Sequence, residues 1–289
     1  MKINRRPLGM LLLFCGVLLM GLSLSGPVRP ASGPVDSGIS LPIIMYHHIL
    51  KDPARQGEYV VSPQILEEDF AYLKRLGYES IVIQDLIDYI QYGEPLPEKP
   101  IMITFDDGYL SNLVYAYPLL EKYDLKAVIS VVGSFCQRYT DDPDDNPAYA
   151  QLSWDQVGQL AATGRVEIQN HSYNLHQSQQ GASLQEAAGE SLDQYRSRLQ
   201  QDLSLNQQLI EQATGKRPTC ITYPFGLTTD AARQLVREMG FASSLSCYER
   251  VNRITRDPEC LFDLGRFNRA AGLSRTAFFE LLAAPPKDP

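Results

Sequence analysis

Two adjacent carboxylates, Asp106 and Asp107, stand at the end of an apolar run and are followed directly by Gly108. The run 101–105 predicts a buried strand, and Gly108 permits a sharp turn after the acids. Adjacent carboxylates at the mouth of a strand repel each other and lose hydration, so a fold tolerates them only when a cation or a proton lies between them. The alternative interpretation is an ordinary Asp-Asp-Gly turn.

The chain has four histidines, His47, His48, His171 and His176, and all of them fall near the ends of predicted strands. On a helix, the separation between His171 and His176 would turn the two side chains roughly 140° apart. In a loop that follows a strand, the second can fold back towards the first. Two imidazoles and one carboxylate make a three-ligand metal site with open positions, as in hydrolytic zinc enzymes. An iron(II) facial triad and a hydrogen-bonded pair of histidines are the alternatives.

Alternating apolar and amphipathic segments must position these side chains. We expect strands over 41–46, 80–83, 101–105, 127–132, 166–170, 219–223, 241–245 and 261–267. We expect helices over 63–76, 85–92, 111–123 with a bend at Pro118, 153–164, 184–213, a segment ending at Met239, and 275–283, with a polar loop over 138–151. This alternation predicts an α/β fold with a parallel sheet, and about eight strands suggest a closed or nearly closed (β/α) barrel. The carboxyl ends of such strands gather the chemistry.

Composition narrows the class of protein. The apolar fraction of 44% is that of an ordinary folded chain, and the net charge of −8 argues against binding to nucleic acid or to anionic membranes. Four cysteines beyond the N-terminal segment, Cys136, Cys220, Cys247 and Cys260, lack metal-type spacing. We expect them to be unpaired buried thiols, and two disulfides are the alternative.

The N-terminal segment has the pattern of a targeting signal. A basic start is followed by an uncharged apolar run from about 8 to 24. We expect residues 1–25 to be a signal peptide or an N-terminal membrane anchor, 26–40 to be a linker rich in Pro, Gly and Ser, and 41–289 to be the catalytic domain. The protein is then extracytoplasmic, either secreted or anchored to the cell membrane.

Three motifs together resemble the polysaccharide deacetylases, the NodB-homology proteins of carbohydrate esterase family 4. They are Thr104–Gly108, His171-Ser172 with His176, and Tyr223–Gly226, and the resemblance covers about 41 to 270. The opening Met45–His48 and the five-residue histidine spacing are similar to the branch that deacetylates poly-N-acetylglucosamine. The resemblance implies a distorted barrel of seven or eight strands.

The resemblance also implies roles for individual residues. Asp107, His171 and His176 would bind a divalent metal, most often zinc, and Asp106 would be the general base. The backbone N–H of Phe225 would stabilise the oxyanion.

Two departures from the family pattern lead to further expectations. Thr222 stands where the wider family has an arginine that pairs with the base, and Arg266, at another strand end, is the candidate substitute. The family usually supplies a late histidine as general acid, but no histidine follows His176. In the branch that this chain resembles, a Tyr-His pair near the start supplies the acid, and the resemblance therefore implies His47, with His48 as the second choice.

The expected function is that of a metal-dependent hydrolase that removes N-acetyl groups from polysaccharides containing N-acetylglucosamine. The expected partner is an N-acetylated glycan, either poly-N-acetylglucosamine or a peptidoglycan-like chain, and we expect a monomer. Aromatic residues that could stack on sugar rings are Tyr46, Tyr109, Trp154, Tyr173, Tyr223 and Phe225. A catalytically inactive carbohydrate-binding protein with the same fold is the alternative function, and an iron oxygenase is a third.

Overall fold

Strand β6, Pro100–Phe105, lies inside the sheet and leads into the aspartate pair at its carboxyl end. All six residues are buried, as expected for a parallel strand that is covered on both faces. The computed structural model describes residues 38–176 and 183–286. β6 pairs in parallel with β2 (Ile43–Tyr46) along one edge, and with β5 (Glu79–Ile81) and β7 (Ala127–Val131) along the other.

The parallel sheet continues from β7 through β8, β9 and β10, and from β2 to β12. The bounds of these strands are Val166–Asn170 for β8, Cys220–Thr222 for β9, Ser243–Leu245 for β10 and Phe267–Asn268 for β12. Two short pairs lie outside this sheet: β3 (His48–Ile49) runs parallel to β4 (Val60–Val61), and β1 (Ile39–Leu41) runs antiparallel to β11 (Asn252–Ile254).

A short segment near residue 265 closes the sheet. Leu264 pairs with Leu245 of β10, and Phe267 pairs with Ile44 of β2, so the same segment lies against both edge strands. The amide of Leu264 donates to the carbonyl of Ser244 at 2.9 Å. We call residues 264–268 the seam. The predicted distorted (β/α) barrel is confirmed, and the seam is the place where it closes.

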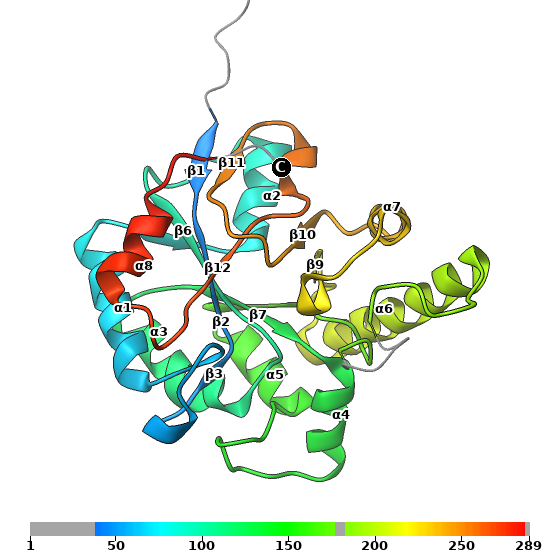
Figure 1. The fold of residues 1–289 in the computed structure, drawn as a ribbon, viewed down its shortest axis with the longest axis horizontal. Coiled ribbons are helices and arrows are strands. Elements are labelled where there is room, and N and C mark those ends of the chain that lie inside the picture. Colours follow the sequence, from blue (N-terminus) through cyan, green and yellow to red (C-terminus); the bar gives the residue numbers. More distant parts are fainter. Residues whose placement is uncertain (1–37, 177–182, 287–289) are drawn as a thin grey trace, which may run out of the picture. The chain divides into compact units, whose positions relative to one another are not determined.

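Helices connect the strands and surround them in Figure 1. Their bounds are Pro63–Arg75 (α1), Ile83–Tyr92 (α2), Tyr117–Lys122 (α3), Gly133–Asp141 (α4), Trp154–Ala162 (α5), Leu192–Thr214 (α6), Asp230–Glu238 (α7) and Arg275–Leu282 (α8). Ser62, Ser153 and Ser191 cap α1, α5 and α6, because each side-chain oxygen accepts a backbone amide from the first turn. Ser274 caps α8 in the same way, so serine caps fix the starts of four helices.

Four local expectations were wrong. The polar loop expected from 138 overlaps the end of α4. The helix expected from 184 begins only at Leu192, since Gly189 takes a left-handed φ of 78° and Ser191 forms a capping box. The strand expected over 261–267 is mostly irregular and pairs only within the seam. The single helix expected over 111–123 consists of a π-helical turn at Asn112–Ala116 followed by α3, with Pro118 in the first turn of α3 and not in the middle of a helix.

The predicted segment 1–25 and most of the predicted linker 26–40 lie outside the described residues. The end of the linker was placed wrongly, because Ile39 and Ser40 belong to β1 and pair with β11. Within the described ranges, no helix combines the length and the apolar character needed to cross a bilayer. These four cysteines are free thiols, as expected. Cys136 and Cys220 are buried, but the expected burial was wrong for Cys247, which is exposed, and for Cys260, which is only partly buried.

Candidate active site

The aspartate pair turns two carboxylates towards different partners. Asp106 and Asp107 follow β6 and are only 2% and 7% exposed. Asp107 takes a left-handed φ of 69°, an unusual conformation for a residue other than glycine, although aspartate tolerates it better than most. Asp106 contacts Arg266, whereas Asp107 contacts the histidines of the loop after β8. The neighbours therefore serve two separate parts of one site.

Arg266 of the seam holds Asp106 through two hydrogen bonds. Its Nη1 donates to Oδ1 at 2.7 Å and its Nη2 donates to Oδ2 at 2.8 Å. Burial alone would raise the pKa of Asp106, but the guanidinium holds it well below its ordinary value. Thr222, at the family's usual arginine position, instead shares a hydrogen bond of 2.6 Å with Ser130. Arg266 thus pairs with Asp106, as expected of the residue that replaces the family's arginine.

Asp107, His171 and His176 converge at one point. Their candidate ligand atoms all lie within 4.8 Å of one another, and Asp107 Oδ1 is 3.5 Å from His171 Nε2 and 3.2 Å from His176 Nε2. Asp107 Oδ1 is buried and has no hydrogen bond of ordinary geometry. A buried carboxylate oxygen between two imidazole nitrogens is what a divalent cation with mixed N and O ligands requires. The donor set therefore fits a metal.

The two imidazoles are prepared differently for this role. His171 is fully enclosed, and its Nδ1 lies 2.8 Å from the carbonyl oxygen of Thr222, which directs Nε2 towards Asp107. Burial tends to lower the pKa of His171, but the hydrogen bond and charge of Asp107, together with the charge of Asp106, raise it above its ordinary value. Burial and the neighbouring His171 lower the pKa of His176. The surroundings of the two imidazoles therefore shift their pKa values in opposite directions.

A carboxylate on α6 holds the loop that carries both histidines. Asp202 accepts the backbone amides of Tyr173 at 2.7 Å and Asn174 at 2.8 Å. These contacts tie the middle of the 171–176 segment to a rigid helix, so the second histidine folds back as a loop and not as a helical turn.

Local turns within the same loop reinforce this arrangement. Asn170 Oδ1 accepts the amide of Ser172 at 2.8 Å, and the Ser172 hydroxyl accepts the amide of Leu175 at 3.1 Å. Ser172 has a left-handed φ of 70°. Such strained backbone persists only where its surroundings hold it, and it is common at functional sites.

The two histidines after β2 have different environments. His47 lines the cavity above the aspartates, with Nε2 at 3.9 Å from Asp106 Oδ2, and burial lowers its pKa. His48 is buried, with Nδ1 at 2.8 Å from the Ser111 hydroxyl and Nε2 at 3.1 Å from the carbonyl oxygen of Ala148. Both ring nitrogens of His48 are therefore engaged in the scaffold, so only His47 is placed to reach a substrate.

Phe225 borders the site from the turn after β9. It takes a left-handed φ of 58°, its side chain is 46% exposed, and its ring centroid lies 4.4 Å from that of His176. Of the other aromatic residues expected to stack on sugars, Tyr109 lines the cavity, whereas Tyr46 and Tyr223 are buried in the core.

The site opens into a cavity of about 860 Å³. Its lining includes all of the predicted site residues except Arg266, which lies behind Asp106. The cavity also has walls that the sequence analysis missed, formed by Glu58, Tyr59, Cys247 and Glu249. No local motif marks these four positions, because they lie in loops after β3 and β10 and reach the site only through the closure of the barrel.

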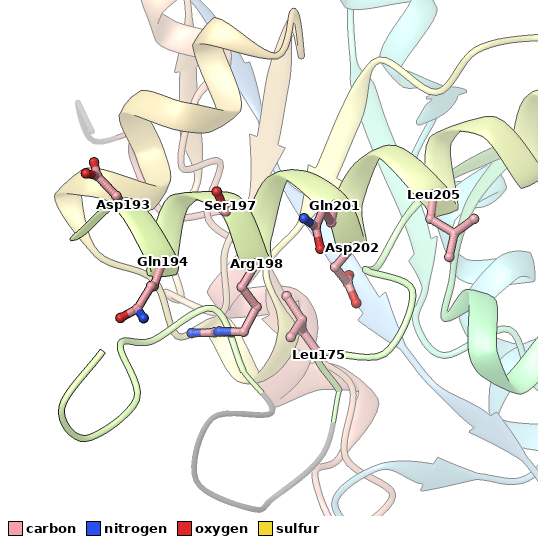
Figure 2. Close-up of a pocket in the computed structure, with 8 residues that line it drawn as sticks. All are labelled: Leu175, Asp193, Gln194, Ser197, Arg198, Gln201, Asp202 and Leu205. Atoms are coloured by element: carbon pink, nitrogen blue, oxygen red, sulfur yellow. The ribbon is translucent and has the colours of Figure 1, made fainter. Parts of the chain in front are cut away.

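A second cavity runs along α6 and is shown in Figure 2. Leu175 and Leu205 supply apolar surface, while Asp202 and Arg198 supply charge. Asp202 is occupied by the two loop amides, and Arg198 is paired with Glu190 at 2.7 Å. Because these charged groups are already satisfied, we assign the chemistry to the cavity above the aspartates.

Comparison with known proteins identifies the class. A model of the family described as "Polysaccharide deacetylase" matches residues 93–244, just over half of the 289 residues. The chain belongs to the polysaccharide deacetylase family, as its three motifs predicted.

Individual relatives refine the comparison. The poly-beta-1,6-N-acetyl-D-glucosamine N-deacetylase of Escherichia coli K12 is 27% identical over 219 residues, which cover 68% of this chain and 32% of that protein. The chain thus spans about a third of the length of this relative. The structure of a de-N-acetylase from Aggregatibacter actinomycetemcomitans is similar, with a TM-score of 0.74 and 27% identity over 84% of this chain and all of the other. The deacetylase domain of BpsB from Bordetella bronchiseptica has a TM-score of 0.63 and 27% identity over 81% of this chain and 97% of the other.

Proposed function

We propose that this protein is a metal-dependent hydrolase that removes N-acetyl groups from polysaccharides containing N-acetylglucosamine. One observation carries the proposal: Asp107, His171 and His176 converge beside a second carboxylate, Asp106, at the floor of an open cavity. A ligand set with free positions next to an unliganded base is the arrangement of hydrolytic metal sites. The names of the relatives support the proposal that the bond cleaved is the amide of an N-acetylated glucosamine.

Asp107, His171 and His176 are the proposed holders of the cation, with zinc as the first choice among divalent metals. When bound, such a cation polarises the acetyl carbonyl and lowers the pKa of a water molecule. Asp106 then accepts the proton of the attacking water, and Arg266 keeps this carboxylate ionised and oriented.

Two residues that line the cavity are proposed to carry out the remaining steps. The backbone N–H of Phe225 is the proposed donor to the oxyanion that forms as water adds to the amide carbon. His47 is the proposed general acid, because it lies beside Asp106 on the open side of the site. It donates a proton to the departing nitrogen as the C–N bond breaks, so that acetate and a free sugar amine are the products.

The proposed division of the chain into segments is based on the sequence. Residues 1–25 are a signal peptide or membrane anchor, a linker follows, and the catalytic domain begins with β1. The enzyme then acts outside the cytoplasm as a monomer on an N-acetylated glycan.

The experiment measures acetate release from acetylated glucosamine polymers, with and without a chelator, together with bound metal. We expect Asp106→Asn to keep its metal and lose turnover, and His171→Ala or His176→Ala to lose the metal. Circular dichroism of each variant controls for folding. Normal turnover by Asp106→Asn would refute the assignment of the base. Glycan binding without acetate release over a series of metals would instead indicate a non-catalytic binding protein.

A further inference from the structure

The charges that line the active-site cavity are all of one sign. Four carboxylates, Asp106, Asp107, Glu58 and Glu249, face it, and none of the described residues that line it is a lysine or an arginine. Asp106 is matched by Arg266 from behind, and Asp107 belongs to the metal site. Glu58 and Glu249 form no ion pair with any described residue of the chain. Two exposed carboxylates at the cavity walls are therefore available to a cationic ligand.

Glu58 belongs to a wall that is firmly built. Its carbonyl oxygen accepts the Asn268 side-chain amide at 2.9 Å, and the carbonyl oxygen of Tyr59 accepts the amide of His48 at 3.1 Å. The Tyr59 ring is 52% exposed, and its centroid lies 4.9 Å from that of His47. The Glu58 carboxylate lies close enough to the Tyr59 hydroxyl to raise the pKa of Tyr59 by hydrogen bonding. Glu58 and an open aromatic face thus lie together beside the proposed general acid.

Glu249 belongs to the wall on the Phe225 side. It follows Cys247, which packs so closely on Gly226 that a Cβ added to that glycine would lie 2.8 Å from the Cys247 Cβ. The cavity lining thus holds two exposed aromatic rings, Tyr59 and Phe225, together with two exposed carboxylates, Glu58 and Glu249. Aromatic faces stack on the apolar faces of sugar rings, and carboxylates bind ammonium groups.

We propose that this cavity selects glucosamine chains that are already partly de-N-acetylated, and binds a free amine beside the acetylated unit under attack. The inference rests on the proposed deacetylase function and names its substrate class. Sugar amines next to Glu58 or Glu249 are held in their protonated form. Glycans whose sugars carry carboxylates, such as peptidoglycan-like chains, are repelled by the same two charges. The product of one cleavage is therefore a better substrate for the next.

The test compares three glucosamine pentamers at slightly acidic pH: one fully acetylated, one with a single free amine next to an acetylated unit, and one with that amine succinylated. We expect kcat/KM to be highest for the amine and lowest for the succinyl form. Glu58→Gln and Glu249→Gln should each reduce the ratio of kcat/KM for the amine substrate to kcat/KM for the acetylated substrate by about 1.4- to 5-fold, the range for one exposed charge pair. The double variant should reduce this ratio further. High salt should reduce the preference in the wild type.

Glu98→Gln is the matched control, because it removes an exposed glutamate at the amino end of β6, away from the cavity. It should leave the ratio unchanged. A wild-type enzyme without preference, or a double variant with the same preference, would overturn the inference while leaving the deacetylase function intact. If no pentamer released acetate, that function would fail, and binding of a fully deacetylated pentamer would decide the inference: tighter binding than that of the acetylated pentamer, lost in the double variant, supports it, and equal binding refutes it.

Discussion

Arg266 and Asp106 stand 160 positions apart in the sequence and form a bidentate ion pair in the interior of the barrel. Arg266 is 0% exposed and Asp106 is 2% exposed, so neither charge is solvated by bulk water. Further hydrogen bonds from Arg266 to the carbonyl oxygen of Ser246 and the hydroxyl of Thr104 satisfy the rest of the guanidinium. Removing either partner therefore leaves a buried and uncompensated charge.

The first prediction concerns this pair. Arg266→Met should destabilise the fold by about 3–5 kcal/mol, since the buried Asp106 charge loses its bidentate guanidinium partner, and acetate release should fall with it. Urea unfolding followed by circular dichroism measures the free energy. Arg275→Met removes an arginine from an exposed pair with Glu68 and should cost about 1 kcal/mol or less. Equal losses in the two variants would contradict the role given to the buried pair.

A second prediction concerns pH. In the wild type, Arg266 holds the pKa of Asp106 well below its ordinary value, so the carboxylate stays ionised and its stabilising contribution is lost only in strong acid. In Arg266→Met, burial remains but the guanidinium is gone, so the pKa of Asp106 rises. The acidic limb of the plot of kcat/KM against pH should therefore move to higher pH. An unmoved limb would show that Asp106 does not govern it.

A third prediction separates the adjacent histidines. His47→Gln should lower kcat by about 10²- to 10⁴-fold, the usual contribution of a general acid, without lowering metal content. His48→Gln should mainly lower stability, because His48 bonds to Ser111 and Ala148 and not to the cavity. Rates, metal content and thermal unfolding of both variants are the measurements. The opposite pattern would transfer the acid role to His48.

A fourth prediction concerns the clamp on the histidine loop. Asp202→Asn leaves one of two loop amides without an acceptor, and we expect metal affinity to fall by about 10- to 100-fold, as for other residues that orient metal ligands. Competition with a chromophoric chelator measures it. Asp193→Asn is the control, since this residue lies on the same helix and is exposed. Unchanged affinity in Asp202→Asn would mean that the loop holds its shape without the clamp.

The sequence predicted the floor of the site better than its walls. Asp106, Asp107, His171 and His176 stand in short motifs at the ends of apolar runs, and the barrel brings such ends together. Arg266 was also accessible as a basic residue at a predicted strand end. The role of Asp202 could not be predicted, because a single acid on a long polar helix matches no motif. Its role is visible only from its hydrogen bond to the amide of Asn174, 28 residues away in the sequence.

The same limit applies to the fold. The long parallel strands were predicted from their apolar runs, but the seam was not, since Leu264 and Phe267 pair with strands that lie far away in the sequence. The start of α6 was misplaced because the polar stretch before it has helical composition, while Gly189 and Ser191 decide where the helix begins. Backbone conformation at single residues outweighed average propensity in this case.

The seam follows in the sequence the strands that it contacts, so it is synthesised after them. When the ribosome has extended the polypeptide through β10, both acids and both ligand histidines are already present, but the arginine that neutralises the first acid has not yet emerged. The unfinished polypeptide thus holds every proposed metal ligand without a competent base. Asp106 gains its counter-charge only when the segment 264–268, which carries Arg266, joins the edge strands of the barrel.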